Sequence, residues 1–228
     1  MTLYLGIEDI EPNNWVAWVF ELPGCYARGT TRDQALTLVP SAVDELLDRL
    51  SAADFRVSDT QPPFSFSIEE EFRTIPGSSD YLVNAFFRND TIPLGSADVA
   101  YATCLFDLNR NELHAIISSL SDAILGRPIA GEVQQTIHGI IRHIGTAEWW
   151  YWDCLGLAFP RQELPHDIAE LLPKVRGYTL QRLPELIGST LTTERSGEKW
   201  SPRKLLRRAI WHERVHTLQI SRYLKHSF

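Results

Sequence analysis

The chain changes its hydrophobic period near residue 75, and this change constrains the fold more than any other feature. Before it, residues 3–10 and 15–22 are rich in β-branched and aromatic side chains and partly alternate in polarity, with the turn sequence EPNN between them. This pattern predicts a β-hairpin. Residues 64–72 alternate in the same way and predict a third strand, whereas residues 22–31, with two glycines, are expected to form a loop.

A helix is predicted between the hairpin and the third strand, over residues 32–50. Its apolar positions recur at helical spacing: Ala35, Leu38, Ala42, Leu46 and Leu50. Thr30 or Thr31 can cap its start. Pro40 lies inside the pattern and is expected to kink the helix, because proline removes a backbone hydrogen bond. Residues 1–75 are therefore predicted to form a small α/β domain.

After residue 75 the pattern is helical. Four helices are predicted, over about residues 97–123, 131–156, 166–188 and 201–225. Ser96 is expected to cap the first, and Pro173 and Pro184 are expected to break or shorten the third. Ser201 caps the fourth, with Pro202 at its first helical position. The short connections favour an up-down four-helix bundle, so we expect an α+β chain with a connector and bundle over residues 76–228.

Composition limits the class of protein. Hydrophobic residues make up 44% of the chain and charged residues 22%, as in a soluble globular protein. The formal net charge of −7 argues against a nucleic-acid-binding surface. The three cysteines are widely spaced without a CxxC pair, which indicates a reducing compartment and no disulfide framework. No signal-peptide pattern and no membrane-length apolar run is present, so we expect a cytoplasmic protein without a membrane partner.

Two histidines in the last predicted helix share one face. His212 and His216 are four residues apart, which places them about 40° apart around a helix. The same stripe carries Leu205, Ala209 and Tyr223, which indicates that it faces the bundle interior. Such a pair is either two hydrogen-bonded core histidines or a two-histidine metal clip.

A third histidine lies on the apolar stripe of the second predicted bundle helix. His143 shares this stripe with Ala147, whose small side chain would leave room for an ion one turn away. His138 falls on the opposite face, and Cys154 is roughly 16 Å along the helix from His143, too far for the same ion. Three neutral imidazoles suit Zn, Ni, Fe or Cu, and we expect Zn or Ni. Three protein ligands also leave coordination positions for water and substrate.

Residues 212–216 spell HERVH, the signature of many zinc peptidases. A peptidase of this type needs a third ligand after the motif. Only 12 residues follow His216, and Arg222 stands where one peptidase class has its third histidine. We therefore interpret the motif as a metal clip with an incidental Glu213, and not as a protease site.

Residues 131–225 resemble the DinB-like superfamily of four-helix bundles with a three-histidine metal centre. The stretches that carry the resemblance are IRHIGTAEWWYW (141–152) and WSPRKLLRRAIWHERVHTLQI (200–220). It implies that His143, His212 and His216 are the metal ligands. It also implies a metal-dependent enzyme, because some members are transferases or isomerases that use low-molecular-weight thiols.

The N-terminal part resembles HicB-type antitoxin domains. The resemblance is carried by FELPGCYARGTTRDQALTLVPSAVDELL (20–47), from which Val39-Pro40 departs. No DNA-binding helix-turn-helix or ribbon-helix-helix pattern follows it, so we do not expect a repressor. It implies a protein-interaction module.

Further side chains are candidates for the surroundings of the ion: Glu148, Trp150, Tyr151, Gln219, Tyr223, Arg207 and Arg208. Glu148 is expected to bind Arg207 or Arg208, or to orient a ligand. Trp150 and Tyr151 face the histidines as core or as pocket wall. The basic run at 203–208 is expected to be a solvated face, with the binding of an anionic substrate group as the alternative.

Two functions remain open from the sequence. The first is a metal-dependent transferase, isomerase or hydrolase acting on a small molecule, with catalytic residues unknown. The second is a non-enzymatic interaction or regulatory protein that uses the HicB-like part, with the bundle as scaffold or dimeriser. A homodimer and a protein partner of the N-terminal part are compatible with both.

Overall fold

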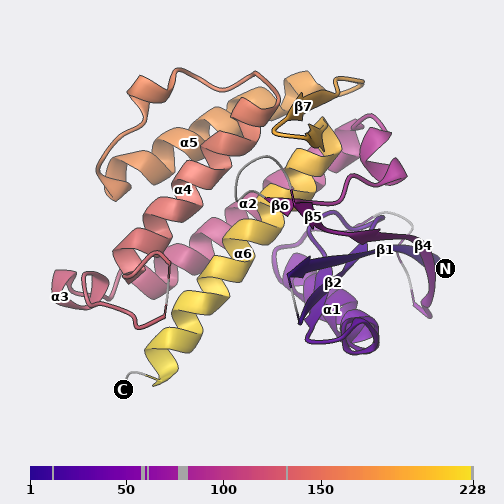
Figure 1. Ribbon diagram of the computed structural model, residues 1–228, viewed down its shortest axis with the longest axis horizontal. Coiled ribbons are helices and arrows are strands. Elements are labelled where there is room, and N and C mark those ends of the chain that lie inside the picture. The colour runs from indigo at the N-terminus through magenta and orange to yellow at the C-terminus, as the bar shows by residue number, and fades with distance from the viewer. Residues whose placement is uncertain (12, 58–59, 61, 77–81, 132, 227–228) are drawn as a thin grey trace.

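The computed structural model describes the chain except residues 12, 58–59, 61, 77–81, 132 and 227–228. The fold is α+β, as predicted, with a sheet near the N-terminus and long helices in the C-terminal part (Figure 1). Among the described residues, none of the helices has the length and apolar character needed to cross a bilayer.

The N-terminal sheet has four strands in the order β3-β2-β1-β4. These are β1 (Thr2–Glu11), β2 (Asn14–Val19), β3 (Tyr26–Gly29) and β4 (Ser65–Arg73). The antiparallel pairing of β1 with β2 confirms the predicted hairpin, and β4 is the predicted third strand, parallel to β1. The expected loop over residues 22–31 is wrong in its second half, where β3 pairs with β2. Four residues are too few for an alternating pattern to stand out in the sequence.

Both faces of the sheet are covered at β2, whereas the edge strand β4 is largely exposed. Helix α1 (Arg32–Ala52) packs against one face, and the hydroxyl of Thr31 accepts a hydrogen bond from the Gln34 N–H at 3.2 Å, which confirms the cap. The helix continues past Pro40 and ends at Ala52, close to the predicted end at residue 50. On the other face, Trp18 of β2 packs against Trp211, with ring centroids 5.6 Å apart. Because alternate residues of a strand point to opposite faces, β2 is buried on both sides.

Four long helices pack together in the C-terminal part (Figure 1). They are α2 (Ser96–Ile117), α4 (Ile137–Cys154), α5 (Ile168–Arg182) and α6 (Pro202–His226). Helix α6 contacts both α2 and α4, and α4 contacts α5. The short elements are β5 (Ile75–Pro76), β6 (Leu82–Val83), η1 (Arg88–Thr91), α3 (Asp122–Leu125), η2 (Arg161–Glu163), η3 (Leu183–Leu186), β7 (Thr193–Arg195) and β8 (Glu198–Trp200).

The ends of these helices correct several predictions. The cap of α2 is Gly95 and not Ser96, because the Asp98 carboxylate accepts the Gly95 N–H at 2.8 Å and closes the first turn. Helix α2 ends at Ile117 and does not run to residue 123. Helix α4 begins six residues later than the predicted 131, where the hydroxyl of Thr136 accepts the Gly139 N–H at 2.9 Å.

The two prolines of the third long helix behave differently. Helix α5 runs through Pro173 without a break, which contradicts the prediction for that residue, whereas Pro184 is the second residue of η3, which follows directly where α5 ends. The start of α6 is confirmed. Its first helical residue is Pro202, and the Ser201 hydroxyl accepts the Lys204 N–H at 3.2 Å.

One apolar core joins the sheet to the helices. It contains Leu5 of β1, Val43 of α1, Leu105 of α2, Trp152 of α4 and Leu206 of α6, each 2% exposed or less. The division into domains at residue 75 stays a prediction. The shared core nevertheless packs the first part of α6, up to Ile210, against both the sheet and the other helices.

The basic run at residues 203–208 is buried, and the prediction of a solvated face is wrong. Three of its cations pair with carboxylates outside the helix: Arg203 with the distant Asp98, Arg207 with the distant Asp90, and Lys204 with Glu198, six residues before it. Burying a charge costs free energy unless an opposite charge accompanies it. The partners, which sequence periodicity does not reveal, therefore decide that this face lies inside.

Candidate metal centre

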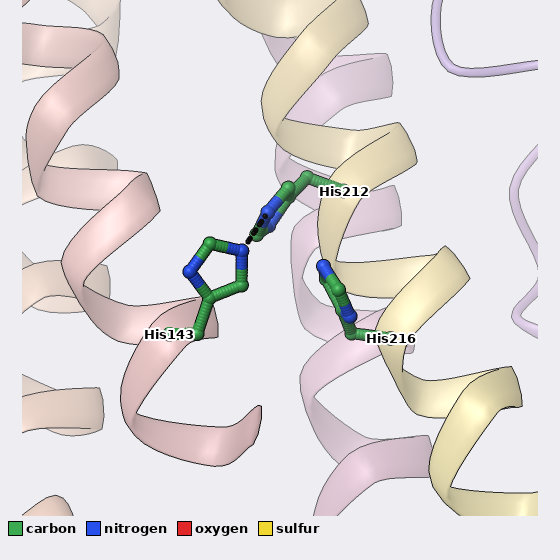
Figure 2. A group of neighbouring side chains, drawn as sticks. All are labelled: His143, His212 and His216. Carbon is green, nitrogen blue, oxygen red and sulfur yellow. Dashed lines mark hydrogen bonds between the residues drawn. The ribbon is translucent and has the colours of Figure 1, made fainter. Parts of the chain in front are cut away.

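Helices α4 and α6 bring three histidines together (Figure 2). His143 projects from α4, and His212 and His216 project from successive turns of α6. One ligand atom of each lies within 4.8 Å of the others, and Nε2 of His212 is 3.0 Å from Nε2 of His143. The sequence predicted that these three residues face one another, and the structure agrees.

The donor set fits a transition-metal ion. Imidazole nitrogens bind zinc at about 2.0–2.1 Å, so two of them at a tetrahedral angle lie about 3.3 Å apart. The 3.0 Å between His143 and His212 is close to that separation. The ligand atom of His216 lies within 4.8 Å of those of the other two residues.

Gln219 orients His216. Its Oε1 lies 2.6 Å from Nδ1 of His216, and an amide oxygen only accepts hydrogen bonds. Nδ1 therefore donates to Gln219, and in the neutral form of His216 the lone pair that binds a metal lies on Nε2. A hydrogen bond to the second ring nitrogen is typical of metal-binding histidines, because it holds both the tautomer and the ring direction.

Burial favours the neutral form of two of the imidazoles, those of His143 and His212. Burial, together with the positive charge that His216 can carry, lowers the pKa of His143 to about 4. Burial also lowers the pKa of His212, and the neighbouring His216, His143 and Arg208 add to the effect. Neutral imidazoles offer a lone pair, so protons compete weakly with a metal at pH 7.

The lowered pKa of His143 predicts that the metal-free protein gains stability as the pH rises from about 4 to 6.5. In this window the unfolded chain binds more protons at residue 143 than the folded chain, so the free energy of unfolding increases with pH. Urea denaturation of chelator-treated protein at pH 5 and pH 7 measures the gain. We expect a smaller gain for His143→Asn and an unchanged gain for His138→Asn. Equal gains in stability in the two variants would contradict the assignment of this pH dependence to His143.

The other described histidines lie away from this group. His114, His138 and His166 are exposed, and the side chain of His226 lies outside the described residues. The outward orientation of His138 agrees with the sequence. Cys154 is buried and is not part of the histidine group.

Glu213 is not incidental. It is 2% exposed, and its carboxylate lies 2.6 Å from Nε of Arg110 and 2.5 Å from Nη2 of Arg176. Both of its carboxylate oxygens bind guanidiniums, and the residue lies outside the histidine group, so it is not placed to activate a metal-bound water. The structure therefore agrees with the rejection of a peptidase and corrects the role given to this residue.

Glu148 binds the same two arginines. It is 2.9 Å from Nη2 of Arg110 and 2.9 Å from Nε of Arg176, so the expected partners Arg207 and Arg208 are wrong. Burial alone would raise the pKa of Glu148, but Arg176 and Arg110 outweigh it and hold this pKa below its usual value. The result is a buried quartet of two arginines and two glutamates that joins α2, α4, α5 and α6.

Aromatic rings lie on one side of the histidine group, next to His212. The Tyr151 ring lies 5.9 Å from the His212 ring and 5.4 Å from the Trp200 ring, and Trp150 lies 5.3 Å from Trp200. Trp150 and Tyr151 therefore sit beside the site, as predicted. Trp200 was not among the predicted residues, because it precedes α6 and follows no helical period.

The remaining predicted residues, which are Arg207, Arg208 and Tyr223, lie in different surroundings. Arg207 is bound to Asp90 at 2.7 Å. Arg208 stacks 4.4 Å from the Trp211 ring, and its Nε and Nη1 have no hydrogen-bond partner among the described residues. Tyr223 packs against the apolar cluster around Ile220, at the far end of α6.

No protein-family model matches the chain, and neither the curated proteins nor the solved structures include a significant match. The geometry of the site therefore carries the functional argument.

Proposed function

We propose that this protein is a metal-dependent enzyme of the DinB-like type, a thiol-dependent transferase or isomerase that acts on a small molecule. The convergence of His143, His212 and His216 is the observation that carries the proposal. Zn or Ni is the proposed ion, because a donor set of imidazoles suits both.

The chemistry follows from the number of ligands. A divalent ion held by three imidazoles keeps positions for a thiol or water, and lowers the pKa of the bound group so that a nucleophile forms near neutral pH. The chain supplies the arrangement around it. Gln219 orients His216, the Tyr151 ring packs 5.9 Å from the His212 ring, and the small Ala147 lines the same cavity as His143.

We further propose that residues 1–75 form a HicB-like domain and that residues 76–228 contain a DinB-like bundle. All three cysteines are unpaired, which fits the cytoplasmic location that we propose. A low-molecular-weight thiol is the proposed cosubstrate.

A protein-interaction role is the second candidate. Strand β4 forms one edge of the sheet, and Ile68 on it is 41% exposed, so a partner strand can pair there. Both faces of β2 are already covered, whereas β4 is largely exposed, so the β4 edge is the place for a partner.

Metal analysis of protein purified without a histidine tag separates the two functions. About one Zn or Ni ion per chain supports the enzyme, and a thiol-transfer screen with electrophilic small molecules then follows. No metal after growth in supplemented medium would favour the interaction role.

We expect chelation to lower the melting temperature. A ligand that binds only the native state stabilises it by about 4 kcal/mol at a free concentration of 1,000 Kd. For a chain of this size, that corresponds to roughly 10 °C. Scanning calorimetry before and after long incubation with a chelator measures the shift. Unchanged melting, with metal removal verified by elemental analysis, would contradict stabilisation by the ion.

A further inference from the structure

A cavity lined largely by α4 lies beside the histidine group. Its volume is about 700 Å³, within the range of roughly 300–1,000 Å³ that small-molecule sites occupy. His143 lines this cavity, together with residues of α4, of the segment around η2, and of β7. A molecule held here would therefore lie next to one member of the histidine group.

The cavity is cationic although the chain is acidic. It is lined by Arg142, Arg161 and Arg195 and by one carboxylate, Asp153, which leaves a net charge of two positive units. The formal charge of the whole chain is −7. Concentrating positive charge in a cavity of an acidic protein favours an anionic ligand there.

Two of the arginines have no carboxylate partner among the described residues. Nη1 of Arg142 donates to the carbonyl oxygens of His166 at 2.6 Å and of Pro165 at 3.3 Å, so this guanidinium is held in place with its charge uncompensated. Arg161 is exposed at the mouth and makes no ion pair in the described part of the chain. Arg195 differs, since it is paired with Asp153.

Two indoles form the apolar part of the lining. Trp149 is 8% exposed, and its Nε1 donates to the Phe159 carbonyl at 2.9 Å, which holds the ring in place. Trp150 is half-buried and packs on Trp200. Flat apolar surfaces beside fixed guanidiniums match a ligand that has both a flat apolar body and a carboxylate.

We propose that this cavity is the substrate pocket and that its substrate is a small organic anion with a flat apolar body. Arg142 and Arg161 receive the carboxylate, the indoles of Trp149 and Trp150 contact the body, and His143 marks the end at which the reaction occurs. Only the role of His143 rests on the proposed function, because recognition of the anion uses residues outside the histidine group.

Isothermal titration of the full chain with benzoate and with its neutral analogue benzamide tests the proposal. We expect benzoate to bind more tightly, and its affinity to fall as sodium chloride is added, because salt screens the guanidiniums. Arg161→Gln should weaken benzoate binding roughly fivefold or more. Arg88→Gln removes an exposed charge that lies near Glu70 on the sheet, and serves as the matched control without effect.

Asp153→Asn is expected to change the affinity for benzoate in the opposite direction from Arg161→Gln. It removes the carboxylate that neutralises Arg195, which stays anchored on the carbonyl oxygen of residue 153 at 3.1 Å. We expect benzoate affinity to rise roughly fivefold. A loss of affinity in both Arg161→Gln and Asp153→Asn would indicate a general disturbance of the cavity and overturn the charge argument.

Titrations of metal-loaded and chelator-treated protein separate this proposal from the proposed function. Benzoate binding that depends on Arg161 in both forms supports the pocket even where metal analysis fails. Equal affinities for benzoate and benzamide, or equal effects of Arg161→Gln and Arg88→Gln, would overturn it.

Discussion

Protein carrying His143→Ala, His212→Ala or His216→Ala will be isolated without stoichiometric metal, whereas His138→Ala will retain it. The three side chains approach within 4.8 Å at their ligand atoms, so each variant removes one of three donors to a single ion. Two remaining imidazoles bind a divalent ion much more weakly. Elemental analysis of untagged protein after dialysis measures the loss.

The control at His138 matches the change without touching the site, because that side chain is exposed on the other side of α4. Circular dichroism verifies that each variant is folded. Metal lost from His138→Ala but kept in His143→Ala would mean that the ion binds elsewhere on α4. Retention in all four variants would contradict the proposed centre.

Glu213→Gln will lower the free energy of unfolding by about 3–5 kcal/mol, because it leaves a guanidinium charge uncompensated in the core. The carboxylate is 3% exposed, and Arg110 and Arg176 both bind it. With Glu213 neutral, these two cations share only Glu148. Urea denaturation of the metal-loaded protein measures the loss.

Glu112→Gln is the matched control. Glu112 also binds two arginines, Arg49 and Arg214, but it is 33% exposed and therefore screened by water. We expect this variant to lose about 1 kcal/mol or less. Equal losses in the two variants would show that the buried quartet contributes no more than a surface network.

The Glu213→Gln variant also tests the interpretation of residues 212–216 as a peptidase site. Folded Glu213→Gln protein should keep its metal, because Glu213 binds Arg110 and Arg176 and is not part of the histidine group. A peptide-hydrolysis assay runs beside the metal analysis. Hydrolysis present in the natural chain and lost in the variant would revive the protease interpretation.

Local sequence alone determined the hairpin, the start of α6 and the inward face of that helix. Each of these depends on neighbours within a few residues: the alternation in β1 and β2, the Ser201-Pro202 cap, and the four-residue spacing of His212 and His216. Such features follow from the period of a helix or a strand, which a sequence displays directly. The site could be predicted for that reason.

Only the tertiary structure decided what the charged residues do. Glu148 and Glu213 bind Arg110 and Arg176, which lie on other helices, 28 to 103 residues away along the chain. The basic run at 203–208 lies inside because its carboxylate partners come from other segments. The cavity beside His143 depends in the same way on where the η2 segment and β7 fold back. Periodicity describes one element at a time, whereas the pairing of buried charges and the shape of a cavity depend on how elements pack, which no local pattern encodes.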